Sequence, residues 1–371
     1  MCRKLFNFAL LMGTVLLTGC LKSESNNNSG SQEYVITEGA YILNAGDPAN
    51  GKDGSLTFLD YQADNTANVI SNIYPVGNNP TDVLVWGNKV YIAGCGTNTI
   101  YVLDKKTRSL IDKINTVEEM GEEAGFGPSH LASYGSNVYV STHGGYVAVI
   151  DTTSLTVNAS PIKVGSYPEG MGIGVTKDSN GNISDITLWV ANSDNGNGNG
   201  SLSKVNLKTG SVTEVKNDLI SNPRSVLVAG SNAYVLDYGT IDTDGNQKNN
   251  GVYYVSGSNV SLLIEGATGI SAASTSIITY NYPKGSDKVE YKVYNLYYDT
   301  LSNFYLNGGS AYPSITNPTA IALDPNAGYM LISNPNFINM YDGNGNFVKS
   351  FDTGDNPCSI CYSYGTQVIK Q

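Results

Sequence analysis

Residues that could carry out hydrolysis or bind a transition metal are scarce in this chain of 371 residues. It contains only two histidines, His130 and His143. No Gly-x-Ser-x-Gly sequence supplies a nucleophilic serine, and two histidines are too few for a metal site built from imidazoles. The sequence therefore disfavours catalysis and predicts no metal cofactor. Each histidine is either a ligand contact or a surface residue bonded to backbone or water.

Three Asp/Asn/Gly runs place oxygen atoms at alternate positions, as calcium-binding loops do. They cover residues 178–182, 242–246 and 342–346. All three lack the distal glutamate that completes such a loop, and the same composition is typical of hairpin turns. Calcium is therefore kept as an alternative, for which the best candidate ligands are Asp242, Asp244 and Asn246.

The N-terminal segment carries the signals of export and lipid attachment. Arg3 and Lys4 precede an apolar run over residues 5–17, which is too short to span a bilayer but fits a secretory signal peptide. The run ends in Leu-Thr-Gly-Cys, which resembles a bacterial lipobox. We therefore expect residues 1–19 to be removed and Cys20 to be acylated.

The next segment, residues 20–33, is polar and low in complexity, which predicts a flexible tether before a globular part over 34–371. That part contains Cys95, Cys358 and Cys361. The last two have CxxC spacing, but no helix follows and no second pair exists. Ordinary strand cysteines are favoured, and a disulfide from Cys95 to Cys358 or Cys361 is the alternative.

Composition favours strands and turns over helices. Charged residues make up only 14% of the chain, whereas Gly occurs 41 times and Tyr 26 times. Tyrosine fits a pleated, half-buried surface, and Gly supplies tight turns, so the composition predicts an all-β protein. The net charge of −11 argues against a nucleic-acid partner, because phosphate binding requires a basic surplus.

A proline-anchored segment recurs along the chain and predicts the architecture. The anchor prolines stand at positions 80, 128, 168, 223, 318 and 357. Their intervals are 39 to 55 residues, except one of 95 that equals two periods, with residues 268–271 where the missing anchor belongs. The mean period is about 46 residues, which is the length of a four-stranded propeller blade.

Each period reads as four strands, A to D, with strand A directly after the proline. Residues 40–44, 55–60 and 68–74 supply strands B, C and D before the first anchor, and residues 359–364 supply a final strand A. Pairing of these ends closes the ring and removes open sheet edges. The prediction is a seven-bladed β-propeller whose first blade is closed by the N- and C-terminal strands.

These repeats resemble the YVTN-repeat, or YncE-like, seven-bladed propellers. In that family a proline anchor, a Tyr-Val-x-Asn strand and an Ile-x-Val-Ile-Asp strand recur. Residues 188–192 and 330–334 end in the asparagine of the first motif, and residues 147–151 match the second. The resemblance covers 34–371, although the sixth blade lacks its proline and several blades lack the asparagine.

The position of a loop within the four-strand repeat determines the face of the ring on which it lies. The D-to-A and B-to-C loops share one face, and here they are long and irregular, which is typical of binding loops on a rigid scaffold. Both histidines belong to this face, in the third blade. The candidate ligand-binding residues are Asn44, Asp47, Asn79, Asn98, Phe126, His130, His143, Tyr146, Tyr167, Glu169, Asn192, Arg224, Asp237, Tyr238, Tyr282, Asn334, Phe337 and Asn356.

Such a face offers amides and phenols but few charges, which suits a large, weakly charged ligand with many hydrogen-bonding groups. Glycans usually stack on exposed tryptophan, yet Trp86 falls in an A-to-B turn and Trp189 at a core position of strand B. This counts against a glycan. A corrinoid presents a broad ring edged by amides, which Asn, Tyr and Phe side chains could bracket.

Lipobox, asparagine-rich tether and YVTN-type ring together resemble the BtuG family of surface-exposed cobalamin-binding lipoproteins. The resemblance implies a non-enzymatic outer-membrane lipoprotein at the cell surface. It would capture cobalamin (vitamin B12) or a related corrinoid and pass it to a TonB-dependent transporter. The alternatives are a periplasm-facing anchor, a glycan-binding or protein-interaction propeller of a surface nutrient-uptake system, and a propeller lactonase or redox enzyme with a metal or quinone on the axis.

Overall fold

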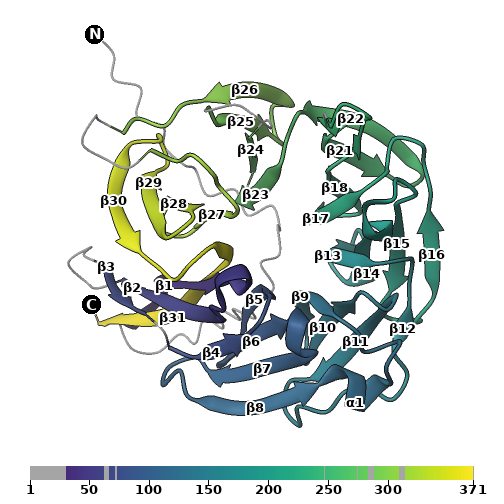
Figure 1. Cartoon of the computed structure of the whole chain (residues 1–371), viewed down its shortest axis with the longest axis horizontal. Coiled ribbons are helices and arrows are strands. Elements are labelled where there is room, and N and C mark those ends of the chain that lie inside the picture. Colours follow the sequence, from purple (N-terminus) through teal and green to yellow (C-terminus); the bar gives the residue numbers. More distant parts are fainter. Residues whose placement is uncertain are drawn as a thin grey trace.

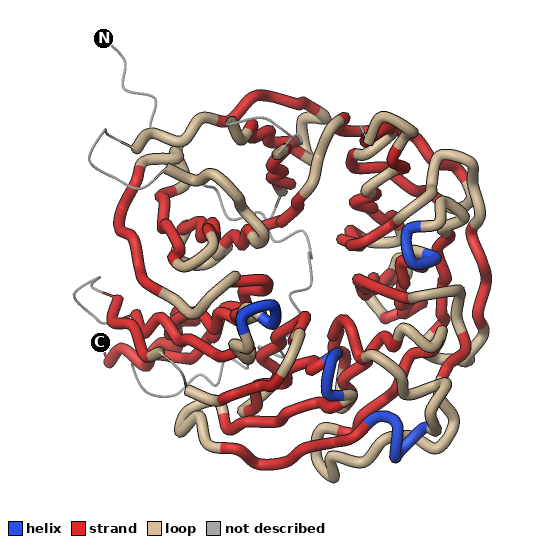
Figure 2. The backbone as a smooth tube through the Cα atoms, in the orientation of Figure 1, coloured by secondary structure: helices blue, strands red, loops and turns tan. Residues whose placement is uncertain are grey.

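The computed structural model describes residues 31–61, 67–71, 73–245, 247–273, 275–282, 288–308 and 314–370. Over these residues the chain forms seven antiparallel blades of four main strands each, arranged in a ring (Figure 1). Strands dominate, and helices are confined to a few short turns (Figure 2). The predicted all-β, seven-bladed propeller is confirmed.

The first four blades are described from the innermost strand outward. Blade 1 contains β31 (Pro357–Lys370), β1 (Ser31–Asn44), β2 (Gly54–Tyr61) and β3 (Ala67–Ile70), with β4 (Pro75–Gly77) also paired to β2. Blade 2 contains β5 (Pro80–Trp86), β6 (Lys89–Gly94), β7 (Thr99–Asp104) and β8 (Leu110–Asn115). Blade 3 contains β9 (Pro128–Tyr134), β10 (Asn137–Thr142), β11 (Tyr146–Asp151) and β12 (Ile162–Lys163). Blade 4 contains β13 (Pro168–Lys177), β14 (Ile183–Asn192), β15 (Ser201–Asn206) and β16 (Val212–Val215).

The other three blades follow the same order. Blade 5 contains β17 (Pro223–Ala229), β18 (Asn232–Asp237), β21 (Gly251–Ser256) and β22 (Asn259–Glu265), with a small hairpin of β19 (Thr240–Ile241) and β20 (Gln247–Lys248). Blade 6 contains β23 (Gly269–Ala273), β24 (Ser276–Asn281), β25 (Glu290–Asn295) and β26 (Thr300–Phe304). Blade 7 contains β27 (Ile321–Leu323), β28 (Tyr329–Asn334), β29 (Phe337–Asp342) and β30 (Phe347–Asp352). The described helical turns are η1 (Pro48–Asn50), η2 (Cys95–Thr97), η3 (Asp194–Gly196) and α1 (Thr116–Met120), and none is long and apolar enough to cross a membrane.

The hydrophobic core lies between neighbouring blades, because each inner strand is apolar on both faces. In β6, Val90 and Ile92 pack into the cluster shared with blade 1, whereas Tyr91 and Ala93 pack into the cluster shared with blade 3. Successive side chains of a strand point to opposite faces of the sheet, so a continuous apolar run buries both. This explains why strand B reads as an unbroken apolar segment in most periods.

The ring is closed by the antiparallel pairing of β1 with β31. The register places Ile42 opposite Ile360 and Tyr41 opposite Cys361. The predicted closing strand, residues 359–364, is confirmed, and its pairing extends to Lys370. Strand β1 begins at Ser31, inside the segment that the sequence predicted to be tether.

The anchor prolines begin the innermost strand in five of the blades, and a repeated turn precedes them. The residue before the proline has a positive φ at Asn79, Tyr167 and Asn356 (51°, 52° and 54°). Carbonyls of these turns accept hydrogen bonds from the loop after strand B of the same blade, as from His143 N to Gly127 O at 3.0 Å. We call the face built from these two sets of loops the anchor face.

Ring closure can be tested at Tyr362 of β31, which is buried among residues of blades 1 and 7 and donates a hydrogen bond to the Ala322 carbonyl at 3.2 Å. We expect Tyr362→Ala to lower the free energy of unfolding by about 3 to 5 kcal/mol, because it leaves a cavity in the core shared by blades 1 and 7. Urea denaturation would measure the change. The matched control is Val368→Ala on the same strand, where the side chain is 52% exposed. Equal effects of the two changes would contradict a stabilising role for the buried side chain of the closing strand.

Candidate functional site

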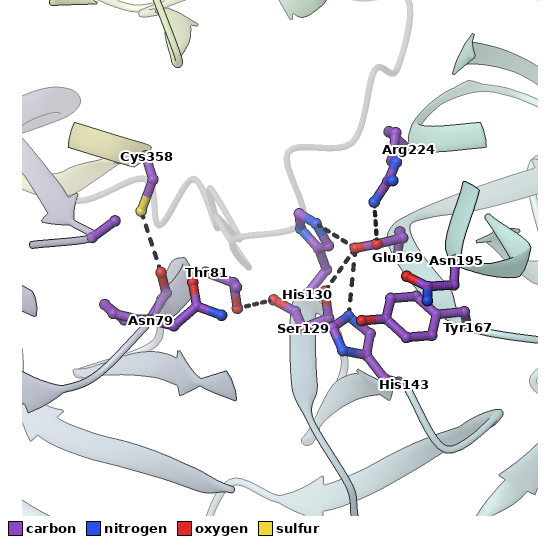
Figure 3. Close-up of a pocket in the computed structure, with 12 residues that line it drawn as sticks. Asn79, Thr81, Ser129, His130, His143, Tyr167, Glu169, Asn195, Arg224 and Cys358 are labelled. Atoms are coloured by element: carbon purple, nitrogen blue, oxygen red, sulfur yellow. Dashed lines mark hydrogen bonds and ion pairs between the residues drawn. The ribbon is translucent and has the colours of Figure 1, made fainter. Parts of the chain in front are cut away.

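A polar hollow of about 340 Å³ opens on the anchor face near the axis (Figure 3). Residues from blades 1 to 5 line it, and six of the candidate ligand-binding residues are among them. Those six are Asn79, His130, His143, Tyr167, Glu169 and Arg224. The structure thus brings together residues that the sequence spreads over 146 positions, from 79 to 224.

The position of a residue within the blade repeat explains which side chains reach the hollow. In five blades the residue directly after the anchor proline is the second residue of the innermost strand, where the ring is narrowest. Thr81, Ser129, Glu169, Arg224 and Cys358 occupy this position in five blades, and all of them line the hollow. A ligand there would contact several blades at once.

Glu169 is the centre of the charged part of the site. Its side chain is only 9% exposed. One carboxylate oxygen, Oε1, accepts a hydrogen bond from Arg224 Nη1 at 2.5 Å, and Oε2 accepts one from Ser129 Oγ at 2.9 Å. Burial raises the pKa of Glu169, but its bond to His143 and the charges of His130 and Arg224 outweigh burial and hold that pKa below the usual value.

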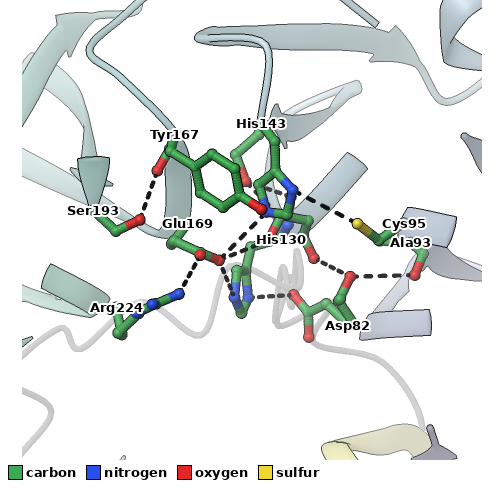
Figure 4. A network of polar contacts seen from close by, with 12 residues as sticks. Asp82, Ala93, Cys95, His130, His143, Tyr167, Glu169, Ser193 and Arg224 are labelled. Carbon is green, nitrogen blue, oxygen red and sulfur yellow. Dashed lines mark hydrogen bonds and ion pairs between the residues drawn. The ribbon is translucent and has the colours of Figure 1, made fainter. Parts of the chain in front are cut away.

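His130 lies between two carboxylates. Its Nδ1 is 3.5 Å from Asp82 Oδ2, and its Nε2 is 3.7 Å from Glu169 Oε2 (Figure 4). Burial lowers the pKa of His130, whereas Asp82 and Glu169 raise it, and the net shift is upward. Asp82 also accepts hydrogen bonds from Leu131 N and Ser359 Oγ, at 2.9 and 2.7 Å, and so ties blade 2 to blades 3 and 1.

His143 lies on the other side of Glu169, with its Nε2 at 3.8 Å from Oε2. Its ring stacks on Tyr167 with centroids 3.8 Å apart, and its Nδ1 is 3.7 Å from Cys95 Sγ. Gly127 permits this position, because a Cβ there would lie 2.8 Å from Nδ1. Burial lowers the pKa of His143, but hydrogen bonds with Cys95 and Glu169 raise it to about 9.

Four other candidates lie beneath the anchor face, at the end of strand B. Asn44 and Asn192 donate to neighbouring hydroxyls, at 3.1 Å to Thr57 Oγ1 and 3.0 Å to Ser203 Oγ. Asp237 and Asn334 each accept from the backbone amides of the loop that precedes the anchor proline. All four are nearly or fully buried, so the structure gives them a place supporting the loops. Their direct contact with a ligand stays a prediction.

The remaining candidates do not line the hollow. Asn98 accepts from Gly127 N, Asp47 accepts from Asn50 Nδ2, and Asn356 donates to Gly46 O. Phe126 and Tyr238 are exposed at 53% and 36%, and the Arg224 guanidinium lies 5.7 Å from the Tyr238 ring. The half-buried ones are Tyr146, Tyr282 and Phe337.

The candidate calcium loop carries an ion pair within its described residues. Asp242 lies 3.1 Å from Lys248 Nζ, and its Oδ1 accepts from Asp244 N. Asn246 lies outside the described residues, as does the lipidation candidate Cys20. Across the described part of the chain, no group of three or more His, Cys, Asp or Glu side chains is arranged to hold a metal ion. Calcium binding stays a prediction.

The three described cysteines are not disulfide-bonded. Cys358 and Cys361 lie in β31, as the strand interpretation expected, and burial raises the pKa of each to about 12. Cys95 differs, because it begins the turn η2 instead of lying in a strand, and it is only half-buried.

Sequence reasoning missed Asp82, Ser129 and Cys95. Each could have been found from its position within the repeat, which matches the position of a site residue in a neighbouring blade. Ser129 directly follows an anchor proline, and Asp82 stands two residues after its proline, as His130 does. Cys95 is the first residue after strand B of blade 2, and His143 is the first after strand B of blade 3. Equivalent positions in adjacent blades therefore meet across the blade interface.

No protein-family model matches this chain, and no curated protein matches it. Solved structures with a similar fold include hydrazine synthase from Kuenenia stuttgartiensis, with 14% identity, a TM-score of 0.57, and 79% of this chain and 95% of that chain covered. A proposed 6-phosphogluconolactonase from Bacteroides fragilis has 14% identity and a TM-score of 0.59, with 88% of this chain and 98% of that chain covered. A functionally unknown protein from Desulfotomaculum acetoxidans has 12% identity and a TM-score of 0.57, with 88% of this chain and 99% of that chain covered. At these identities the likeness shows the propeller fold alone, so the resemblance to YVTN-repeat and BtuG proteins rests on the sequence motifs.

The central role of Glu169 predicts the effect of Glu169→Gln. This change removes the negative charge that Arg224 and both histidines face, so we expect the free energy of unfolding to fall by about 2 to 4 kcal/mol and the pKa of His143 to fall. Chemical denaturation and NMR titration of the histidine rings would measure the two effects. Glu214→Gln, at an exposed position of β16, is the control and should change stability by less than about 0.5 kcal/mol. An unchanged His143 titration in Glu169→Gln would rule out the network.

The raised pKa of His143 predicts a pH-dependent contribution to stability. A histidine with a higher pKa in the folded state stabilises fully below its unfolded value, about 6.5, and loses that contribution as the pH rises through about 9. The stability difference between the native chain and His143→Asn should therefore be largest below pH 6.5, with an upper bound of about 3 kcal/mol, and shrink toward pH 9. Urea denaturation at several pH values would measure it. A constant difference across this window would show that the pKa of His143 is not raised in the fold.

Proposed function

We propose that this chain is a non-enzymatic capture protein that binds cobalamin or a related corrinoid on its anchor face. The observation that carries the proposal is the open polar hollow on the axis, surrounded by long loops from several blades. A rigid ring that presents such loops is suited to hold a broad ligand by many separate contacts.

The size of the hollow is consistent with a ligand that extends beyond it. About 340 Å³ accepts one projecting group of a large ligand, not the whole of it. The rest of a flat ring would lie on the surrounding loops, where Asn79 and Asn195 offer amides and Tyr167 and Tyr238 offer rings. Amides on the protein can pair with amides on a corrinoid edge, because each supplies both donors and an acceptor.

Membrane attachment and hand-over are further parts of the proposal. Acylation of Cys20 would place the propeller on the outer membrane, with the anchor face displayed at the cell surface. A TonB-dependent transporter in the same membrane would then receive the ligand. The support for these steps is the lipobox-like sequence and the tether composition.

The tryptophans give no support to a glycan as the ligand. Trp189 is fully buried, and Trp86 donates from Nε1 to the Gly135 carbonyl between A-to-B turns, away from the anchor face. The exposed aromatic residues in the D-to-A and B-to-C loops described include Phe126, Tyr238 and Tyr305, and none is a tryptophan.

A second candidate is acid–base catalysis, for example hydrolysis of an ester or lactone. One observation favours it: a buried carboxylate, Glu169, lies between two histidines whose pKa values are raised, next to an arginine. Perturbed titrations of this kind gather at active sites, although structural ion-pair networks produce them as well. Turnover assays on lactone and ester substrates separate this candidate from capture.

Calorimetric titration of cyanocobalamin into a soluble chain of residues 21–371 tests the proposal. We expect one-to-one binding that Tyr167→Ala and Tyr238→Ala each weaken at least tenfold, because both rings border the hollow, with a smaller loss for Tyr146→Ala. Tyr297→Ala is the control, since this residue is 71% exposed in the turn between β25 and β26, on the opposite face. Absence of heat at any practical concentration would reject cobalamin, and a glycan array would then be the next screen.

A further inference from the structure

Beyond ligand capture, the structure contains a thiol in unusual surroundings. We propose that Cys95 is a reactive nucleophile, activated by His143 and Glu169, that exchanges with disulfide ligands beside the hollow that these two residues line. The three residues come from blades 2, 3 and 4. Nothing in the proposed corrinoid site requires this chemistry, so the two proposals stand or fall separately.

The arrangement is that of a nucleophile, a base and a group that orients the base. Cys95 Sγ lies 3.7 Å from His143 Nδ1, and His143 Nε2 lies 3.8 Å from Glu169 Oε2 (Figure 4). The two ring nitrogens thus face a sulfur on one side and a carboxylate on the other. A base held in this way can take the thiol proton while the carboxylate stabilises the resulting imidazolium.

The imidazole is fixed in this orientation by its neighbours. Tyr167 stacks on one face of the ring at an interplanar angle of 13°, and the ring lies so close to Gly127 that a Cβ at this position would be 2.8 Å from Nδ1. The His143 side chain is nine-tenths buried, and its Nε2 makes no hydrogen bond of ordinary length in the described structure, since Glu169 Oε2 lies 3.8 Å away. An unsatisfied buried nitrogen beside a hollow is costly, and a ligand or a proton shared with Glu169 removes that cost.

The other two described cysteines provide an internal comparison. The hydrogen-bond partners of both sulfurs are backbone groups, and Cys358 Sγ lies 3.5 Å from the carbonyls of Leu43 and Pro80. Neither has a histidine beside it, and burial raises the pKa of both thiols to about 12. They should be inert under conditions in which Cys95 reacts, because the thiolate is the nucleophile.

The reaction balances without a further oxidant. The Cys95 thiolate, paired with the His143 imidazolium, attacks one sulfur of a disulfide R–S–S–R′. A new bond forms between Cys95 Sγ and the R sulfur as the original S–S bond breaks. The leaving R′ thiolate then takes the proton from the imidazolium and departs as R′–SH. The products are a mixed disulfide on Cys95 and one free thiol.

The test uses the full chain, purified in detergent, with 4,4′-dithiodipyridine as the disulfide. Peptide mapping by mass spectrometry follows each cysteine separately from pH 6 to pH 8. We expect Cys95 to react at least 100-fold faster than Cys358 and Cys361, and its rate to change by less than tenfold over this range. An ordinary thiol with a pKa near 8.5 would accelerate by roughly 80-fold over the same range, following its thiolate fraction.

Variants separate activation from simple exposure. His143→Asn should slow Cys95 at pH 6 by at least tenfold, whereas Tyr297→Ala, an exposed change on the opposite face, should leave the rate unaltered. A Cys95 rate that follows an ordinary thiolate fraction, or one equal to that of Cys358, would overturn the proposal. The pH profile of the unmodified sequence gives this decision even if His143→Asn does not fold.

Discussion

The pairing of β1 with β31 is the constraint on which the remaining structure depends. Seven blades bury apolar faces against each other only while the ring is closed, since an open ring would expose one face of two blades and two sheet edges. The closing strand is the innermost strand of blade 1, so the last residues of the chain fix the position of the first blade. Its buried tyrosine, Tyr362, joins the core shared by blades 1 and 7. Rigidity at the axis therefore comes from the two ends of the chain meeting.

Closure also determines where charge can gather. Innermost strands converge on the axis, and the residue after each anchor proline is brought near its counterparts in neighbouring blades. Three of these residues, Ser129, Glu169 and Arg224, contact one another directly from blades 3, 4 and 5. A buried carboxylate is tolerated there because cations and a hydroxyl surround it on several sides. The same geometry that stabilises Glu169 places both histidines within 4 Å of its Oε2.

The architecture was predictable because short sequence patterns that specify each blade recur along the chain. A proline after a tight turn, an apolar strand and a Gly/Asn turn recur at the period of a blade, and β5, β9, β13, β17 and β31 begin at their anchor prolines. The long loops were also placed on the correct face. The contacts of Glu169 were not predictable in the same way, because Arg224 stands 55 residues away and no spacing rule joins equivalent positions of different blades. Cys95 was treated as a strand residue, since its partner His143 is 48 residues distant. The burial of Asn44 and Asp237 beneath the loops was not predictable either, because it depends on tertiary packing.

The direction of β1 has a consequence for how the molecule would be presented. This strand runs for 14 residues and ends at Asn44, on the anchor face, so its first residue, Ser31, lies at the far end, about 40 Å away along an extended chain. The first described residue therefore lies on the side of the ring opposite the hollow. A propeller held at Ser31 would turn the hollow away from the surface that holds it, with the thickness of the ring between the two.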